Sequence, residues 1–67
     1  MRIFEYALLW HPTDKQAKDE GLKTKLLIEP KYMLAYDDKA AAMAAAMDIP
    51  PEHRQELEQI EIAVRAF

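Results

Sequence analysis

The chain has no cysteine, no serine and no asparagine, and Gly21 is its single glycine. Without cysteine it can form no disulfide and offers no thiolate to a metal ion. A catalytic triad built on serine or cysteine is excluded for the same reason. A phosphate-binding loop needs several glycines, and those are missing too. We therefore expect a protein that has no enzymatic activity, no cofactor and no metal centre.

Long apolar runs and a strong excess of one charge are also missing. No run approaches the roughly 20 apolar residues that span a bilayer, and the net charge is only -3. We expect neither a membrane nor a nucleic acid as partner. The content of 51% hydrophobic and 31% charged residues is typical of a folded chain. Residues 1–67 make one domain, whose small core leaves it marginally stable unless a partner surface adds to it.

Alternating apolar residues predict strands at both ends of the chain. Phe4, Tyr6, Leu8 and Trp10 share one face of a predicted strand over residues 2–10. Residues 24–29 and 32–36 read as two further short strands, because the intervening Pro30 cannot donate to a ladder. Residues 59–67 alternate again and predict a last strand, which we expect to pair with the first.

The remaining segments predict a polar loop and a helix. Residues 11–23 are polar and read as the long tip of a hairpin between the first two strands. Asp37 and Asp38 favour a helix start, and the following alanines carry the helix to about Met47. The prolines at 50 and 51 end it and begin a short helical segment over 52–58. The helical spacing favours packing of one stripe on the sheet, made of Ala40, Met43, Ala44 and Met47.

This order of elements predicts an α+β fold. We expect a small, mostly antiparallel sheet of three to four strands with one alanine-rich helix packed on a face, in the order β-β-β-α-β.

The alanine-rich helix also suggests an interaction surface. Beyond the methionine stripe it presents small apolar side chains on its remaining sides, at Ala41, Ala42 and Ala45 among others. These alanines either serve as good helix formers on a solvent face or pack closely against a second protein. Trp10, at the end of the first strand, is either a core anchor or an exposed contact residue.

Charge is distributed unevenly along the chain. The lysines gather between residues 15 and 31, and the candidate contact residues among them are Lys15, Lys18, Lys23 and Lys25. They form either a solvated hairpin tip or an arm that reaches an acidic neighbour, with a phosphate backbone as the less favoured target. Residues 48–61 are correspondingly acidic, which favours head-to-tail contact with copies of the chain or with a scaffold.

Two pairs of residues have the spacing of metal ligands. His11 precedes Asp14, and His53 precedes Glu56. Each pair supplies two ligands, whereas a structural zinc site needs four. We interpret both histidines as isolated surface residues.

Four segments stand out together: Phe4-Glu5-Tyr6-Ala7, residues 34–41 (LAYDDKAA), Ile49-Pro50 and residues 60–67 (IEIAVRAF). Together they resemble short open reading frames that lie among the virion structural genes of tailed bacteriophages. The resemblance implies a minor capsid or decoration (cement) protein, made in the host cytoplasm and located in the virion. Its partner would be the major capsid protein or another virion protein, bound in many copies at symmetric positions. The resemblance carries no binding residues with it.

A second hypothesis does not depend on the resemblance. A small cytosolic adaptor or regulatory module would capture its partner by protein-protein interaction, adding a strand at an exposed edge of the sheet.

Overall fold

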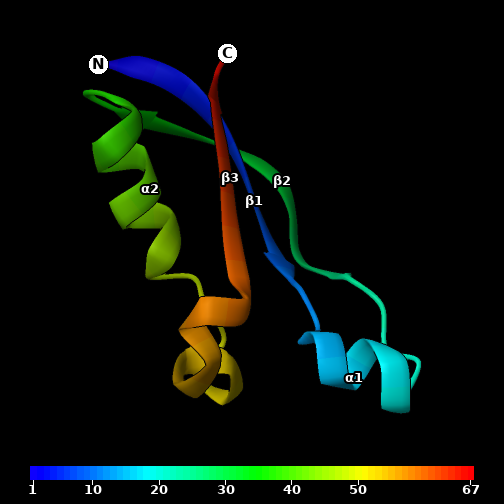
Figure 1. Ribbon diagram of the computed structural model, residues 1–67. Coiled ribbons are helices and arrows are strands. Elements are labelled where there is room, and N and C mark those ends of the chain that lie inside the picture. Colours follow the sequence, from blue (N-terminus) through cyan, green and yellow to red (C-terminus); the bar gives the residue numbers. More distant parts are fainter.

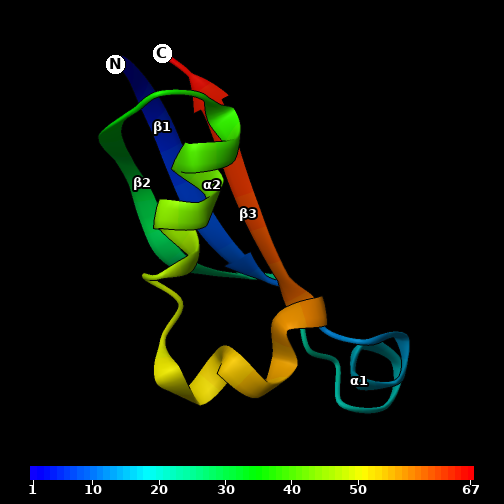
Figure 2. The same ribbon diagram turned by 90° about the vertical axis from the view of Figure 1, so that its left-hand side faces the viewer.

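A computed structural model describes all 67 residues and shows an α+β fold (Figure 1). Its elements are, in order, strand β1 (Arg2–Trp10), helix α1 (Asp14–Asp19), strand β2 (Lys25–Ala35), helix α2 (Asp38–Ala46), 3₁₀ helix η1 (Pro51–Gln59) and strand β3 (Ile60–Ala66). The strands form one antiparallel sheet in the order β2-β1-β3. Helix α2 covers one face of this sheet, while α1 and η1 lie together at one end of an elongated molecule of 45 × 20 × 15 Å (Figures 1 and 2).

Strand β1 is the centre of the fold, as its alternating pattern predicts. Phe4, Tyr6, Leu8 and Trp10 are all buried on the side that faces α2. Both neighbouring strands add to this side, for example Met33 from β2 and Val64 from β3. The predicted pairing of the last strand with the first is confirmed, with Tyr6 opposite Val64.

The two short strands predicted around Pro30 are one strand, β2, so the predicted β-β-β-α-β order is wrong in this respect. Pro30 is not among the residues that pair with β1, and the register shifts between the pairs Tyr6–Lys31 and Leu8–Ile28. Since β2 is an edge strand with an irregular register at this point, the missing N–H of proline costs the ladder nothing.

The predicted polar loop contains a short helix, α1. Thr13 caps it: the threonine hydroxyl accepts from the backbone N–H of Gln16, and the Gln16 side chain accepts from the N–H of Thr13. This reciprocal pair of hydrogen bonds is a capping box. Its signal in the sequence is a threonine followed three residues later by a glutamine. The turn that follows uses Gly21 at a φ of 66°, a backbone conformation that favours glycine.

Helix α2 begins where the sequence predicts, but it faces the sheet with a different side. Asp37 accepts a hydrogen bond of 2.7 Å from the N–H of Ala40 and so caps the first turn. Ala41 and Ala45 have no exposed surface, whereas Met43 and Met47 are 66% and 79% exposed. The predicted methionine stripe is therefore wrong. Small alanines let the helix backbone approach the sheet closely, which a row of long methionines would prevent.

Candidate functional site

Three of the predicted contact residues lie in the core: Trp10, Ala41 and Ala45. Ala41 and Ala45 are fully buried against the sheet, whereas Ala42 is half-buried. Trp10 is also buried, and its indole N–H points to Glu56 Oε2 at 3.4 Å. The alanine face and Trp10 are thus part of the packing within one chain, which corrects the hypothesis that they form an exposed contact surface.

The predicted lysines are exposed, but they do not form a basic end opposite an acidic one. Lys15 and Lys18 lie on α1, Lys23 precedes β2, and Lys25 places its ammonium 5.4 Å from the centre of the Trp10 ring. Figure 1 shows α1 and the acidic η1 at the same end of the molecule. Since both charges lie at one end, they give no basis for head-to-tail contact along the long axis.

The buried Gln59 links these two segments. Its amide nitrogen donates to the backbone carbonyl of His11 at 2.9 Å and to the Gln16 side chain on α1 at 2.8 Å. The N–H of His11 in turn donates to the carbonyl of Gln59. Hydrogen bonds within the chain therefore hold α1, the end of η1 and the residue after β1 together at this end of the molecule.

Neither histidine forms a metal site with the carboxylate that follows it at ligand-like spacing. His11 contacts Thr24 and Glu61 in place of Asp14, at 3.0 and 2.7 Å. His53 Nδ1 lies 3.6 Å from Glu56 Oε1. No group of three or more histidine and carboxylate side chains is close enough to hold a metal ion.

The feature that stands out is the second face of the sheet, which no helix covers (Figure 1). Residues directly opposite one another in neighbouring strands share a face, so the register defines its members. We call this surface the open face; it comprises Ile3, Glu5, Ala7 and Leu9 of β1, Leu26, Pro30, Tyr32 and Leu34 of β2, and Glu61, Ala63, Arg65 and the adjoining Phe67 of the last strand.

The open face is largely apolar and exposed. Its five large exposed residues are each between 47% and 77% exposed: Ile3, Leu26, Tyr32, Leu34 and Phe67. Ile3, Tyr32, Leu34 and Phe67 lie together at one end of the face. At about 200 Å² for each complete residue, these four present roughly 500 Å² of mostly apolar surface. The largest apolar patch on a monomeric protein is about 300–600 Å², and patches of that size are often functional.

Side chains on the open face already contact one another. The rings of Tyr32 and Phe67 meet edge to face, with centroids 5.1 Å apart, and so span the sheet from β2 to β3. Near the middle, Arg65 Nε donates to Glu5 Oε1 at 2.6 Å. This ion pair neutralises the two charges nearest the apolar residues, so the face carries little net charge where a partner would contact it.

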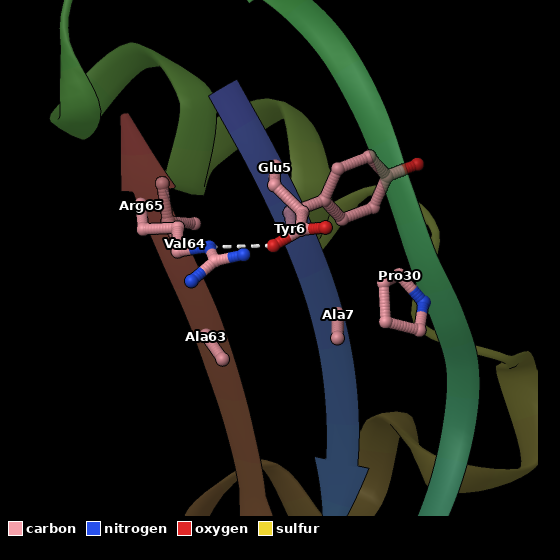
Figure 3. A pocket seen from close by; sticks show the side chains of 7 residues that line it. All are labelled: Glu5, Tyr6, Ala7, Pro30, Ala63, Val64 and Arg65. Carbon is pink, nitrogen blue, oxygen red and sulfur yellow. Dashed lines mark hydrogen bonds and ion pairs between the residues drawn. The ribbon is translucent and has the colours of Figure 1, made fainter. Parts of the chain in front are cut away.

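Figure 3 shows the shallow hollow beside this ion pair, with α2 behind the sheet. The hollow has a volume of about 130 Å³ and is floored by Ala7 and Ala63, with Pro30 at its rim. Two small residues side by side on neighbouring strands leave this space because the larger residues lie farther along each strand. The hollow has room for a side chain of modest size.

A hydrogen bond between the buried Tyr6 and the exposed Asp48 ties the covered face together. The Tyr6 hydroxyl donates to Asp48 Oδ2 at 2.5 Å, which joins β1 to the end of α2. The hydrogen bond to the carboxylate, together with burial and the nearby negative charge, raises the pKa of Tyr6 above 10.0. Since the folded chain holds this proton more tightly than the unfolded chain, stability falls as the pH rises above 10.0.

No protein-family model, no curated protein and no solved structure matches this chain. None of its helices has the length and apolar character needed to cross a membrane.

The sequence contained part of the signal for the open face. Ile3, Ala7 and Leu9 alternate with the core residues of β1 and make its second face mostly apolar as well. Which strands would extend that face, and whether the helix would cover it, depended on the sheet order.

Proposed function

We propose that this protein is a non-enzymatic structural protein that binds the surface of a larger protein assembly through its open face. The observation that carries the proposal is the apolar, uncovered side of the sheet, with Ile3, Tyr32, Leu34 and Phe67 exposed together. Removing this surface from water is favourable at about 25 cal/mol per Å². A partner that covered it would also supply the stability that a 67-residue domain lacks.

The composition of the open face supports a protein partner. Aromatic residues at the centre of an apolar patch are typical of the residues that dominate binding energy. Tyr32 and Phe67 already hold each other in place, so little side-chain entropy is lost when a partner covers them. Each partner contributes roughly 800 Å² to an interface of standard size, so the apolar residues would supply more than half of such a contact and polar residues of the face the rest.

We propose the capsid of a tailed bacteriophage as the assembly, with this chain as a minor capsid or decoration protein. The resemblance to phage virion reading frames supports this choice. A small chain without a large core also suits a role in which many copies bind a shell, because occupied sites stabilise the folded state by mass action.

The experiment that tests this proposal begins with intact phage particles. Mass spectrometry of purified particles should detect the 7.8 kDa chain. Shells that lack the chain should bind the purified protein, and binding should be measured by co-sedimentation. Replacing Leu34 by lysine, opposite Ile3 in the apolar part of the open face, should weaken binding at least tenfold.

The matched control is Met43→Lys, because Met43 is equally exposed but lies on α2, on the opposite side of the molecule. This variant should bind as the wild type does. Absence of the chain from particles would overturn the virion proposal and leave the adaptor hypothesis. If Leu34→Lys and Met43→Lys weaken binding equally, the open face is not the binding surface.

A further inference from the structure

The outer edge of β3 has no partner strand. In the sheet order β2-β1-β3 this strand lies at one side, and neither α1 nor η1 runs along it (Figure 2). The N–H of Phe67 donates to Ile3, and the N–H of His11 donates to Gln59, at the two ends of the ladder with β1. Because inward and outward groups alternate in an antiparallel ladder, the N–H and C=O groups of Ile62 and Val64 point away from β1.

The other edge of the sheet is protected against pairing in a way that β3 is not. Strand β2 contains Pro30 and two shifts of register, and it carries exposed lysines at positions 25 and 31. Prolines, bulges and edge lysines all discourage the addition of a further strand. Strand β3 pairs with β1 in an unbroken register over its whole length and contains no proline.

The sequence of β3 is complementary to itself when read in the antiparallel direction. A two-fold axis at Ala63, the middle residue of Ile60–Ala66, places Glu61 of each copy opposite Arg65 of the other. It also places Ile62 opposite Val64, and these are the residues whose backbone groups point outward. We propose that a second copy of this chain pairs with the outer edge of β3 in this register, forming a two-fold dimer with one continuous six-stranded sheet.

The charges select this register over its neighbours. The side chains of Glu61 and Arg65 are 55% and 75% exposed. Glu61 contacts His11 through Oε1 alone, so its Oε2 can accept from a second copy. Arg65 uses only Nε in its bond to Glu5, which leaves its two terminal nitrogens for a carboxylate of the other copy. A shift of the axis by one residue in either direction removes both cross-strand charge pairs and leaves part of β3 unpaired.

The dimer would enlarge the open face. A two-fold axis perpendicular to the sheet keeps both α2 helices on one side and both open faces on the other. The dimer would therefore present two adjacent apolar patches to a partner, and binding through both raises the avidity. The dimer itself uses a different surface from the proposed function, so each can fail without the other.

The first test exchanges charges between copies. Glu61→Lys alone and Arg65→Glu alone each place two like-charged pairs across the axis, so the dissociation constant of the dimer should rise roughly tenfold. An equimolar mixture of the two variants restores both attractive pairs in the mixed dimer. We expect sedimentation equilibrium to show dimers in the mixture at concentrations where each variant alone is monomeric.

The controls are Glu52→Lys and Lys39→Glu, which change the net charge equally at exposed sites off the strand. Both should dimerise as the wild type does. Because the mixture contains the same two chains as the separate samples, misfolding of a variant cannot explain recovery. A mixture no more dimeric than its components would overturn the proposed register.

The second test uses the absence of cysteine. Directly opposed residues that are not hydrogen-bonded to each other lie with their Cα atoms about 4.5 Å apart, which suits a disulfide. Ala63→Cys should therefore give a disulfide-linked dimer under mild oxidation, whereas Leu34→Cys on the open face should give far less. A wild-type chain that remains monomeric at about 1 mM would overturn the proposal of a dimer altogether.

Discussion

Replacing Ala45 by glutamate tests which side of helix α2 faces the sheet. Ala45 has no exposed surface and packs in the cluster that contains Tyr6, Leu8 and Ile49. Its neighbour Ala44 is exposed. The two positions are consecutive on one helix, so helix propensity, local charge and distance from the helix ends are nearly the same for both variants.

The magnitude follows from the burial of the site. A glutamate at Ala45 adds four heavy atoms to a filled interior, and overpacking of this kind costs about 1–3 kcal/mol. If the carboxylate stays inside, its lost hydration costs several kcal/mol more. The free energy of unfolding of a chain of this size is only about 3–10 kcal/mol. We therefore expect Ala45→Glu to lower it by at least about 3 kcal/mol, and Ala44→Glu by no more than about 0.5 kcal/mol.

Urea denaturation followed by far-ultraviolet circular dichroism measures this difference. With a slope of about 1 kcal/mol per M, the midpoint for Ala45→Glu should fall by about 3 M or the variant should be unfolded in water. Ala44→Glu should keep the wild-type midpoint. If the two variants have equal midpoints, or if Ala44→Glu is the less stable, the orientation of α2 described above is wrong.

Two further changes test the polar contacts of the covered face. Tyr6→Phe removes the hydrogen bond to Asp48 and should cost about 1 kcal/mol in urea denaturation near neutral pH. This deficit relative to the wild type should shrink as the pH rises above 10.0, and a constant difference across that range would contradict the raised pKa of Tyr6. Asp37→Ala removes the N-cap of α2 and should lower the free energy of unfolding by about 1 kcal/mol, whereas Asp37→Asn should retain most of it. A wild-type midpoint for Asp37→Ala would show that the cap contributes no stability.

Local signals in the sequence predicted much of the fold. The alternation in β1 gave its buried face, and the aspartate at position 37 gave the start of α2. Both are properties of a few consecutive residues. The short helix α1 was missed although Thr13 and Gln16 carry its capping signal, because that segment has no buried residue and hence no apolar periodicity.

The orientation of α2 was harder to predict from the chain alone. The helix carries alanines on every side. An apolar stripe that includes the methionines is therefore no more distinct in the sequence than one that excludes them. The choice depends on how closely the helix backbone approaches the sheet, which is a property of both surfaces together. As a result, Ala41 and Ala45 were candidates for an interface when they are in fact core residues.

The sequence by itself determined the positions of β1, β3 and α2, since periodicity and capping are local. It also excluded a catalytic triad built on serine or cysteine and a glycine-rich phosphate-binding loop, because the chain has neither serine nor cysteine and a single glycine. Only the tertiary structure decided which surfaces remain uncovered. That depends on the order β2-β1-β3 and on a single helix long enough to cover one side of it. Because a second helix of that length is lacking, the apolar residues opposite α2 remain exposed, and the proposed partner surface lies there.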